Sequence, residues 1–459
     1  IVDWVDFSGA GTFEDRAAAL GGTRPAEGDV PLTPVAVSDP ESGEIEGPDG
    51  PIRLGPVRSA SGVYAVGLLD EARLPQGAFG SGDANGDGSS RTRFAVVAVD
   101  TVEPGLYDTV IVDGDGDGDL SDEQPLRPFR LEPAVGFLRP PGDPAAARTA
   151  FVVTDLAPDG SLVNLGFDGS GHGTHVAGVA AGYDGEAFRG VAPGAQLMVL
   201  KALSSSGEGA WSQIAAAVDY ASLRGADIIT ISIDALTEPP DAGGIEANFL
   251  TRAARDCRCL IIMAAGNDGP GIGSGSTPGS ASSVFAVGAF YTPDMVEADF
   301  GYRPAAPGVW SFSGMGPRAD GSLLPNVVAP GRAPGPVPVW ASEGGYLVFE
   351  GTSVAAPHAA GAAALLLDAA RRRGLQVDPV SVGRALERGA RALSGYNLLE
   401  QGYGAISLAG AWEYLQRPAP AAPPPALPEV PADRGLGSGP GAVYQRGAAP
   451  GRSPLAAWS

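Results

Sequence analysis

A serine, a histidine and an asparagine each lie in a conspicuous segment of small residues. Ser353 lies in GTSVAAPHAAG (351–361), His172 in GHGTHVAG (171–178) and Asn267 in AAGNDGP (264–270). A serine hydroxyl is a poor nucleophile unless a base removes its proton, and histidine is the usual base. An asparagine amide can donate a hydrogen bond to a developing oxyanion. The three side chains therefore indicate acyl-transfer chemistry, although an isolated serine of this kind is more often a helix N-cap.

The residues around these side chains predict the elements that position them. His172 precedes an Ala/Val/Gly helix, Ser353 lies in the first turn of a long apolar helix, and Asn267 follows a buried strand. Continuous apolar strands that alternate with helices predict a parallel sheet covered on both faces. The expected strands are 151–154, 197–202, 227–233, 259–264, 284–289 and 325–329, and the expected helices are 174–182, 211–224, 246–256 and 353–372.

The composition of the chain changes twice along its length. Residues 1–150 are rich in glycine, proline and acids, with short strand-like runs at 62–69, 94–100 and 109–113. Residues 151–416 carry the alternating strands and helices. Residues 417–459 are rich in proline, alanine and glycine, a composition that cannot form a core and predicts a disordered tail. We therefore expect a β-rich region, a catalytic domain and a tail.

Charge and composition exclude several classes of function. The 459 residues carry a formal net charge of −23, which argues against nucleic acid or an anionic membrane as a partner. No run of 18 or more apolar residues appears, so we expect no membrane span. Cys257 and Cys259 are the only cysteines; a disulfide between them would be strained, so we expect an inert pair. Two cysteines also exclude a four-cysteine zinc site.

The three motifs, in the order histidine, asparagine, serine, resemble those of the subtilisin-like serine proteases. The resemblance extends over roughly 150–412. It implies an α/β fold, a three-layer sandwich with a mostly parallel central sheet, here with a β-rich insertion. It also implies that His172 is the general base, Ser353 the nucleophile and Asn267 the oxyanion donor, with no cofactor required for the chemistry.

Further segments resemble the tripeptidyl-peptidase II and pyrolysin branch of these proteases. They are IVDWVDFSGAGTFED (1–15), DGDGDGDL (113–120) and VGAFYTPDMV (287–296). In that branch a long insertion separates the aspartate motif from the histidine motif, and a segment like 1–15 follows the catalytic aspartate. We therefore expect the triad aspartate to be encoded before Ile1, so that this chain alone is nearly inactive. Asp113 is the rival candidate, because TVIVD (109–113) is a strand that ends in an aspartate.

Two acidic loops place oxygen ligands at alternate positions, as calcium-binding loops do. One contains Asp113, Asp115 and Asp117, and the other Asp83, Asn85 and Asp87. Neither loop has a glutamate at its twelfth position, and a solvated acidic turn is the alternative interpretation. Structural Ca²⁺ is therefore the one cofactor that the sequence suggests.

The resemblance also implies a substrate-binding strand. It would include Ser232 and Ile233, with Gly266 at the neighbouring strand end. Asp234 stands where the family usually has glycine, so it would narrow the site or favour a basic substrate residue.

The remaining histidines and the lone lysine receive structural interpretations. His175 lacks the spacing and the glutamate of a zinc-protease motif and is expected to pack within its helix. His358 is also expected to be structural. Lys201, the only lysine, ends a strand and is expected to be solvated or to extend toward solvent.

The sequence therefore predicts a serine peptidase that acts on proteins or peptides, with an endopeptidase favoured over a tripeptide-releasing exopeptidase. The rival is a non-catalytic, acidic, calcium-binding module on an inactive protease scaffold. A secreted or cell-envelope location is favoured, and a cytoplasmic one stays open.

Overall fold

The computed structural model describes residues 1–9, 17, 26–37, 43–74, 82–143, 145–233, 244–276, 279, 281, 283–318 and 321–417. These residues form two compact units. The first comprises residues 1–175, 196–220 and 336–347, and the second comprises residues 176–195, 221–335 and 348 onward. The predicted tail lies outside the described residues apart from Arg417.

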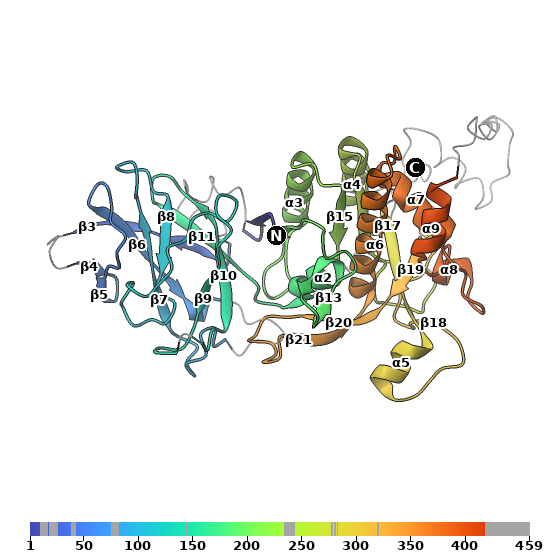
Figure 1. The fold of residues 1–459 in the computed structure, drawn as a ribbon, viewed down its shortest axis with the longest axis horizontal. Helices are drawn as coiled ribbons and strands as arrows, with labels where there is room; N and C mark the ends of the chain where they lie inside the picture. The colour runs from blue at the N-terminus through green and yellow to red at the C-terminus, as the bar shows by residue number, and fades with distance from the viewer. Residues whose placement is uncertain are drawn as a thin grey trace, which may run out of the picture. The chain divides into compact units, whose positions relative to one another are not determined.

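The first unit contains two four-stranded antiparallel sheets, drawn from blue to green in Figure 1. Their orders are β3–β6–β7–β8 and β2–β11–β10–β9. The strands are β2 (Asp29–Pro31), β3 (Thr33–Ala36), β6 (Val63–Asp70), β7 (Arg93–Val99), β8 (Thr109–Val112), β9 (Gly136–Leu138), β10 (Thr149–Leu156) and β11 (Leu162–Phe167). The predicted strand runs at 62–69, 94–100 and 109–113 are thus confirmed to within one residue.

Strand β7 shows why this region has two cores. Successive side chains of a strand point to opposite faces of a sheet. Phe94, Val96 and Ala98 pack with residues of the other four-stranded sheet. Ala95, Val97 and Val99 pack on the opposite side, in a cluster with the hairpin β4 (Glu44–Gly47) and β5 (Gly50–Arg53). A strand buried on both faces needs an apolar residue at every position, and β7 has one from Phe94 to Val99.

A parallel pair of strands completes the first unit. β1 (Asp3–Asp6) pairs with β14 (Met198–Lys201). At the end of β14, the Lys201 ammonium lies 2.8 Å from a Glu27 carboxylate oxygen and 4.5 Å from the centre of the Phe167 ring. The lysine side chain is only 13% exposed. The expectation of a solvated lysine was wrong, because Glu27 supplies a buried counter-charge.

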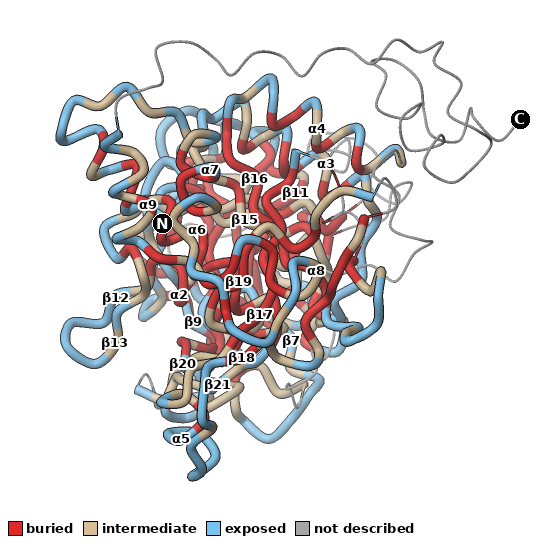
Figure 2. Tube along the Cα trace, turned by 90° about the vertical axis from the view of Figure 1, so that its right-hand side faces the viewer, coloured by how far each residue is buried: buried red, intermediate tan, exposed pale blue. Residues whose placement is uncertain are grey.

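The second unit is built on a mostly parallel sheet. Its strand order is β15–β16–β17–β18, and β19 also pairs with β17. β15, β16, β17 and β19 are parallel, whereas β18 is antiparallel to β17. The strands are β15 (Ile228–Ile231), β16 (Leu260–Ala264), β17 (Phe285–Tyr291), β18 (Gly308–Val309) and β19 (Val327–Pro330). Figure 2 shows β16, β17 and β19 as buried chain.

Helices accompany this sheet, as the alternating pattern predicts. They are α4 (Ile245–Cys257), α5 (Pro293–Phe300), α6 (Thr352–Arg372), α7 (Pro379–Gly389), α8 (Leu398–Gln401) and α9 (Leu408–Leu415). Two more helices, α2 (His172–Ala181) and α3 (Trp211–Leu223), begin in the first unit and end in the second. Short two-stranded sheets join β12 (Tyr183–Asp184) to β13 (Phe188–Arg189) and β20 (Arg332–Pro336) to β21 (Tyr346–Glu350). The predicted α/β class is confirmed. The expected strand 151–154, however, is part of β10, which is antiparallel to both its neighbours in the first unit, so the prediction that it belongs to the parallel sheet was wrong.

Helix α6 is the central helix of the second unit. Its alanine and leucine residues share one core cluster with Ile262 of β16, Val287 of β17 and Val327 of β19. By length and composition it is the one helix in the described chain that could cross a membrane, but 67% of its apolar window is buried inside the protein. That burial is typical of a core helix.

The two cysteines lie where α4 ends and β16 begins. Cys257 and Cys259 form a disulfide. The expectation of an inert, unbonded pair was wrong, because the chain reverses at Arg258, whose φ is +55°. The intervening residue turns the two side chains toward each other.

Candidate active site

Gly266 forms the turn that ends β16. Its φ is +102°, a backbone conformation that favours glycine, and an added Cβ would lie 2.9 Å from Cβ of Ser276. The backbone amide of Gly266 donates to Oγ1 of Thr352 (3.2 Å). This turn carries the next residue, Asn267, to the start of α6.

The side chain of Asn267 is held by the residue before the predicted nucleophile. Its Oδ1 accepts hydrogen bonds from the backbone amide of Thr352 (2.9 Å) and from Thr352 Oγ1 (3.0 Å). Thr352 is fully buried. Because both bonds go to the oxygen of the carboxamide, the nitrogen occupies its other branch. These two hydrogen bonds thus fix the orientation of the carboxamide, and with it the position of the Nδ2 donor.

Ser353 is the second residue of α6. Gly351 precedes the helix with φ of +143°, and its amide donates to the Gly331 carbonyl (2.9 Å). Ser353 is half-buried, whereas Thr352 and Val354 on either side are buried. The first-turn amides and the positive end of the helix dipole favour negative charge beside this serine. The second unit therefore brings together Gly266, Asn267 and Ser353.

The first unit positions His172 at the first residue of α2. The nearby Asp168 carboxylate accepts hydrogen bonds from the backbone amides of Ser170 (2.9 Å), Gly171 (2.8 Å) and Thr174 (3.3 Å). Asp168 thereby caps the helix that carries the histidine. Sequence reasoning missed this residue, because Asp168 lies four positions before the first residue of α2 and not at the adjacent position where a capping residue is expected.

Burial and a neighbouring charge act on His172 in opposite directions. Burial lowers the pKa of the His172 imidazole below its ordinary value, and the Asp168 carboxylate raises it by a smaller amount. The net direction is downward, so the ring is neutral at neutral pH. A neutral imidazole can accept a proton, as a general base must.

The other predicted residues occupy varied positions. Ser232 and Ile233 follow β15 and are half-buried, and Ser232 Oγ donates to the Ser353 carbonyl (3.0 Å). Asp234 lies outside the described residues. His175 is fully buried in α2, and Nδ1 of His358 lies 2.8 Å from the Val354 carbonyl. Both are therefore positioned as structural residues.

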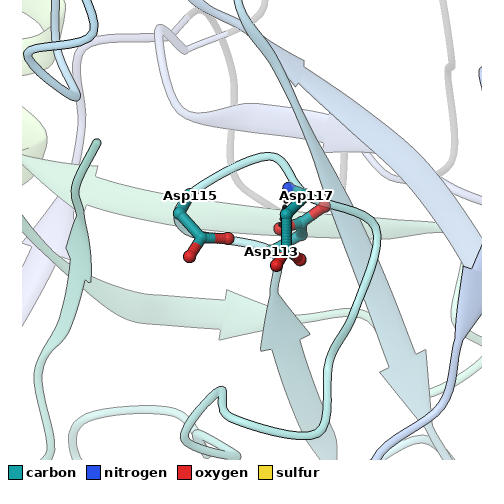
Figure 3. Close-up of side chains that lie close together, drawn as sticks. All are labelled: Asp113, Asp115 and Asp117. Carbon is teal, nitrogen blue, oxygen red and sulfur yellow. Dashed lines mark hydrogen bonds between the residues drawn. The ribbon is translucent and has the colours of Figure 1, made fainter. Parts of the chain in front are cut away.

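Asp113, Asp115 and Asp117 converge in one loop after β8 (Figure 3). Carboxylate oxygens of the three residues lie within 4.8 Å of one another. Asp113 accepts backbone bonds from Gly116 (2.9 Å) and Gly118 (3.0 Å), and both residues have positive φ. Burial, with smaller contributions from the other two carboxylates, raises the pKa of Asp113 to about 6.

Asp115 connects this loop to a second acidic group. Its Oδ2 lies 3.3 Å from a guanidinium nitrogen of Arg139, which also contacts Asp122 and Glu123. Its Oδ1 is buried and has no hydrogen-bond partner among the described residues. Burial raises the pKa of Asp115, against the effect of Arg139. The loop therefore holds more buried negative charge than Arg139 alone neutralises.

The loop at Asp83, Asn85 and Asp87 is more self-contained. Asp83 accepts bonds from the amides of Gly86 (2.6 Å) and Gly88 (3.0 Å). Asn85 donates to Asp87 (3.1 Å), and so does the hydroxyl of Thr92 (2.8 Å). Its side chains satisfy one another, so it is the weaker of the two candidate cation sites.

Comparisons with known proteins identify the family of the chain. The model of the subtilase family matches residues 161–405. The chain belongs to the subtilase family, and its α/β fold is the subtilisin-like fold that the motifs predicted.

The chain is 32% identical to pyrolysin of Pyrococcus furiosus over 418 residues, or 80% of this chain and 29% of pyrolysin. It is 33% identical to tripeptidyl-peptidase 2 of Oryza sativa subsp. japonica over 65% of this chain and 22% of that protein. A solved structure of tripeptidyl peptidase 2 matches with a TM-score of 0.63 at 20% identity, covering 90% of this chain and 36% of that one. The chain thus spans less than a third of the curated relatives it matches.

Proposed function

We propose that this chain is the catalytic part of a serine peptidase that hydrolyses proteins or peptides. The observation that carries the proposal is the pair of hydrogen bonds from Thr352 to Asn267 Oδ1, which orients the asparagine as a donor beside Ser353. A structural N-cap serine needs no such neighbour. Membership of the subtilase family supports the same chemistry.

Three side chains carry out the proposed reaction. His172, neutral because burial lowers its pKa, takes the proton of Ser353 as Oγ attacks the scissile carbonyl. Asn267 Nδ2 and the Ser353 backbone amide hold the resulting oxyanion. His172 then gives its proton to the leaving amine, and water hydrolyses the acyl-enzyme with His172 again as base. No cofactor takes part in these steps.

We infer that Asp113 takes no part in this proton relay. Its carboxylate accepts bonds from Gly116 and Gly118 of its own loop, whereas the carboxylate that acts on the His172 pKa is that of Asp168. None of the described residues is therefore assigned as the acid of the triad, and we expect a low residual peptidase rate. Replacing Asp113 with alanine is expected to leave that rate unchanged; complete loss of it would restore Asp113 to the triad.

Internal cleavage is favoured over tripeptide release. The support is the match to pyrolysin, which covers 80% of this chain against 65% for the rice tripeptidyl-peptidase 2. Long incubation of one ten-residue peptide, with a free or an acetylated N-terminus, separates the two modes by mass spectrometry. Cleavage of both forms is expected, and Ser353→Ala is the control. Tripeptide release from the free form alone would overturn the endopeptidase assignment.

The loop that contains Asp113, Asp115 and Asp117 is proposed to bind structural Ca²⁺. Its carboxylates converge, and the unpartnered Oδ1 of Asp115 is a ligand atom without another use. Carboxylate oxygens are preferred ligands of Ca²⁺. The same observation favours the rival function, a calcium-binding module on an inactive scaffold. Calcium binding without any reaction at Ser353 would support that rival.

A secreted or cell-envelope location accompanies this proposal. The Cys257–Cys259 disulfide supports it, because disulfides persist in oxidising compartments. Quantifying free thiols in protein purified from its native compartment, under alkylating conditions, tests it. Two free thiols per chain would contradict an oxidising location.

A further inference from the structure

Pro357 creates an unusual requirement in the helix that carries Ser353. It is the sixth residue of α6, where the backbone amide of an ordinary residue would donate to the carbonyl four positions earlier. Proline has no amide hydrogen, and its ring crowds that carbonyl. The carbonyl concerned belongs to Ser353. The nucleophile therefore lies in a turn that lacks one of its own helical hydrogen bonds.

Ser232 supplies a donor to that carbonyl from another element. Its hydroxyl, just after the end of β15, donates to the Ser353 carbonyl at 3.0 Å. Ser232 and Ser353 both belong to the second unit, and both are half-buried. The hydroxyl thus takes the place of the absent Pro357 amide.

We propose that Ser232 is a positioning residue for the nucleophile, acting through the Ser353 carbonyl that Pro357 leaves without its helical partner. Fixing this carbonyl fixes the peptide plane after Ser353 and hence the direction of the serine side chain and amide. This role differs from substrate binding by the strand itself. It rests on the proposed function only in taking Ser353 as the reacting residue.

The effect of removing the Ser232 hydroxyl should depend on whether residue 357 is proline. Replacing Ser232 with alanine removes the donor, and the rate of phosphonylation of Ser353 by a fluorophosphonate is expected to fall about tenfold, a typical hydrogen-bond contribution near 1.4 kcal/mol. Ser232→Thr keeps the hydroxyl and restores most of the rate. Pro357→Ala returns a backbone amide to the helix, so Ser232→Ala added to it is expected to change the rate less than twofold.

A matched control comes from the same strand. Thr230 lies two residues earlier, and its buried Oγ1 has no hydrogen-bond partner among the described residues. Thr230→Val removes a hydroxyl from β15 without removing a bond. Its labelling rate is expected to equal that of the unchanged protein, which separates positioning of Ser353 from general damage to β15.

Hydrogen–deuterium exchange tests the inference without any chemistry at Ser353. Ser232→Ala is expected to speed exchange at the amides of Val354 and Ala355, which bond to the Gly351 carbonyl, but not in the Pro357→Ala background. If the unchanged protein cannot be labelled, the proposed function fails and exchange alone decides the role of Ser232. The positioning role of Ser232 would be overturned if Ser232→Ala had equal effects in the unchanged protein and in Pro357→Ala. It would also be overturned if Ser232→Ala changed neither exchange nor labelling.

Discussion

The hydrogen-bonded cluster of Gly266, Asn267 and Thr352 in the second unit and the loop of Asp113, Asp115 and Asp117 in the first unit treat buried polar groups in opposite ways. Around Asn267, donors pair with acceptors. The Gly266 amide donates to Thr352 Oγ1, and the amide and hydroxyl of Thr352 donate to Asn267 Oδ1. Around Asp113, three carboxylates converge, and one buried oxygen of Asp115 has no hydrogen-bond partner among the described residues. The first arrangement pairs its donors and acceptors within the protein, and the second fits the proposed Ca²⁺ site.

The difference indicates which region depends on solution conditions. A matched neutral network changes little with salt or metal, because no net charge is buried. A cluster of buried carboxylates is costly unless protons or a metal ion neutralise it. We therefore expect substitutions around Asn267 to act mainly on the rate of the reaction at Ser353. We expect pH and Ca²⁺ to act mainly on the stability of the Asp113 loop.

The largest expected effect follows from removing the donor of Asn267. Asn267→Ala is expected to lower the rate of peptide hydrolysis about 10²- to 10³-fold, the range for loss of one oxyanion donor. Asn397→Ala is the matched control, because Asn397 is an exposed helix cap of α8. An equal loss of rate in both variants would show that Asn267 has only a structural role.

The reactivity of Ser353 should also depend on the protonation of His172. Because burial lowers the pKa of this imidazole below 6.5, the neutral base persists into mildly acidic solution. The rate of labelling by a fluorophosphonate should be flat from neutral pH down to that lowered pKa and then fall about tenfold per pH unit. A midpoint above 6.5 would contradict the predicted direction.

Removal of calcium is expected to act on stability. Saturating Ca²⁺ at about 100 times its dissociation constant adds about 2.7 kcal/mol to the free energy of unfolding, and a chelator removes it. Asp115→Asn should abolish most of the calcium-dependent shift in melting temperature. Asp143→Asn changes an exposed acid and should leave the shift intact. An unchanged shift in Asp115→Asn would place the ion elsewhere.

Without calcium, the raised pKa of Asp113 gives the stability a dependence on pH with a definite sign. The folded state holds the proton up to about pH 6, whereas the unfolded chain loses it near its usual 3.8. This stabilisation is present below 3.8 and is lost as pH rises through 6, by up to about 3 kcal/mol. Chemical unfolding at pH 4 to 7 measures it, and Asp113→Asn should flatten that dependence. A slope that survives in this variant would have another origin.

Sequence reasoning succeeded where local pattern decides structure. The helix expected at 353–372 is observed as α6, Thr352–Arg372, because its small and apolar residues fit one core face. The strand expected at 259–264 is observed as β16, Leu260–Ala264, since a short run of large apolar residues suits a buried parallel strand. The order of the motifs then sufficed to predict the fold.

Sequence reasoning failed where two interacting residues are far apart in the sequence, or where one backbone angle decides whether two side chains meet. The partner of Lys201 is Glu27, 174 positions away, and no periodicity connects them. The disulfide depends on the left-handed conformation of Arg258, which a sequence pattern does not reveal. The bond from Ser232 to the Ser353 carbonyl also joins separate elements, although Pro357 was visible in the sequence as a residue that removes a helical donor.

One measurement tests the central claim, that Ser353 is an activated nucleophile, most directly. The chain is incubated with a fluorophosphonate, digested and analysed by mass spectrometry to locate the adduct. We expect a single adduct on Ser353, slowed strongly in His172→Ala and absent in Ser353→Ala. An unlabelled Ser353 in folded protein, or labelling that is equal with and without His172, would contradict the account.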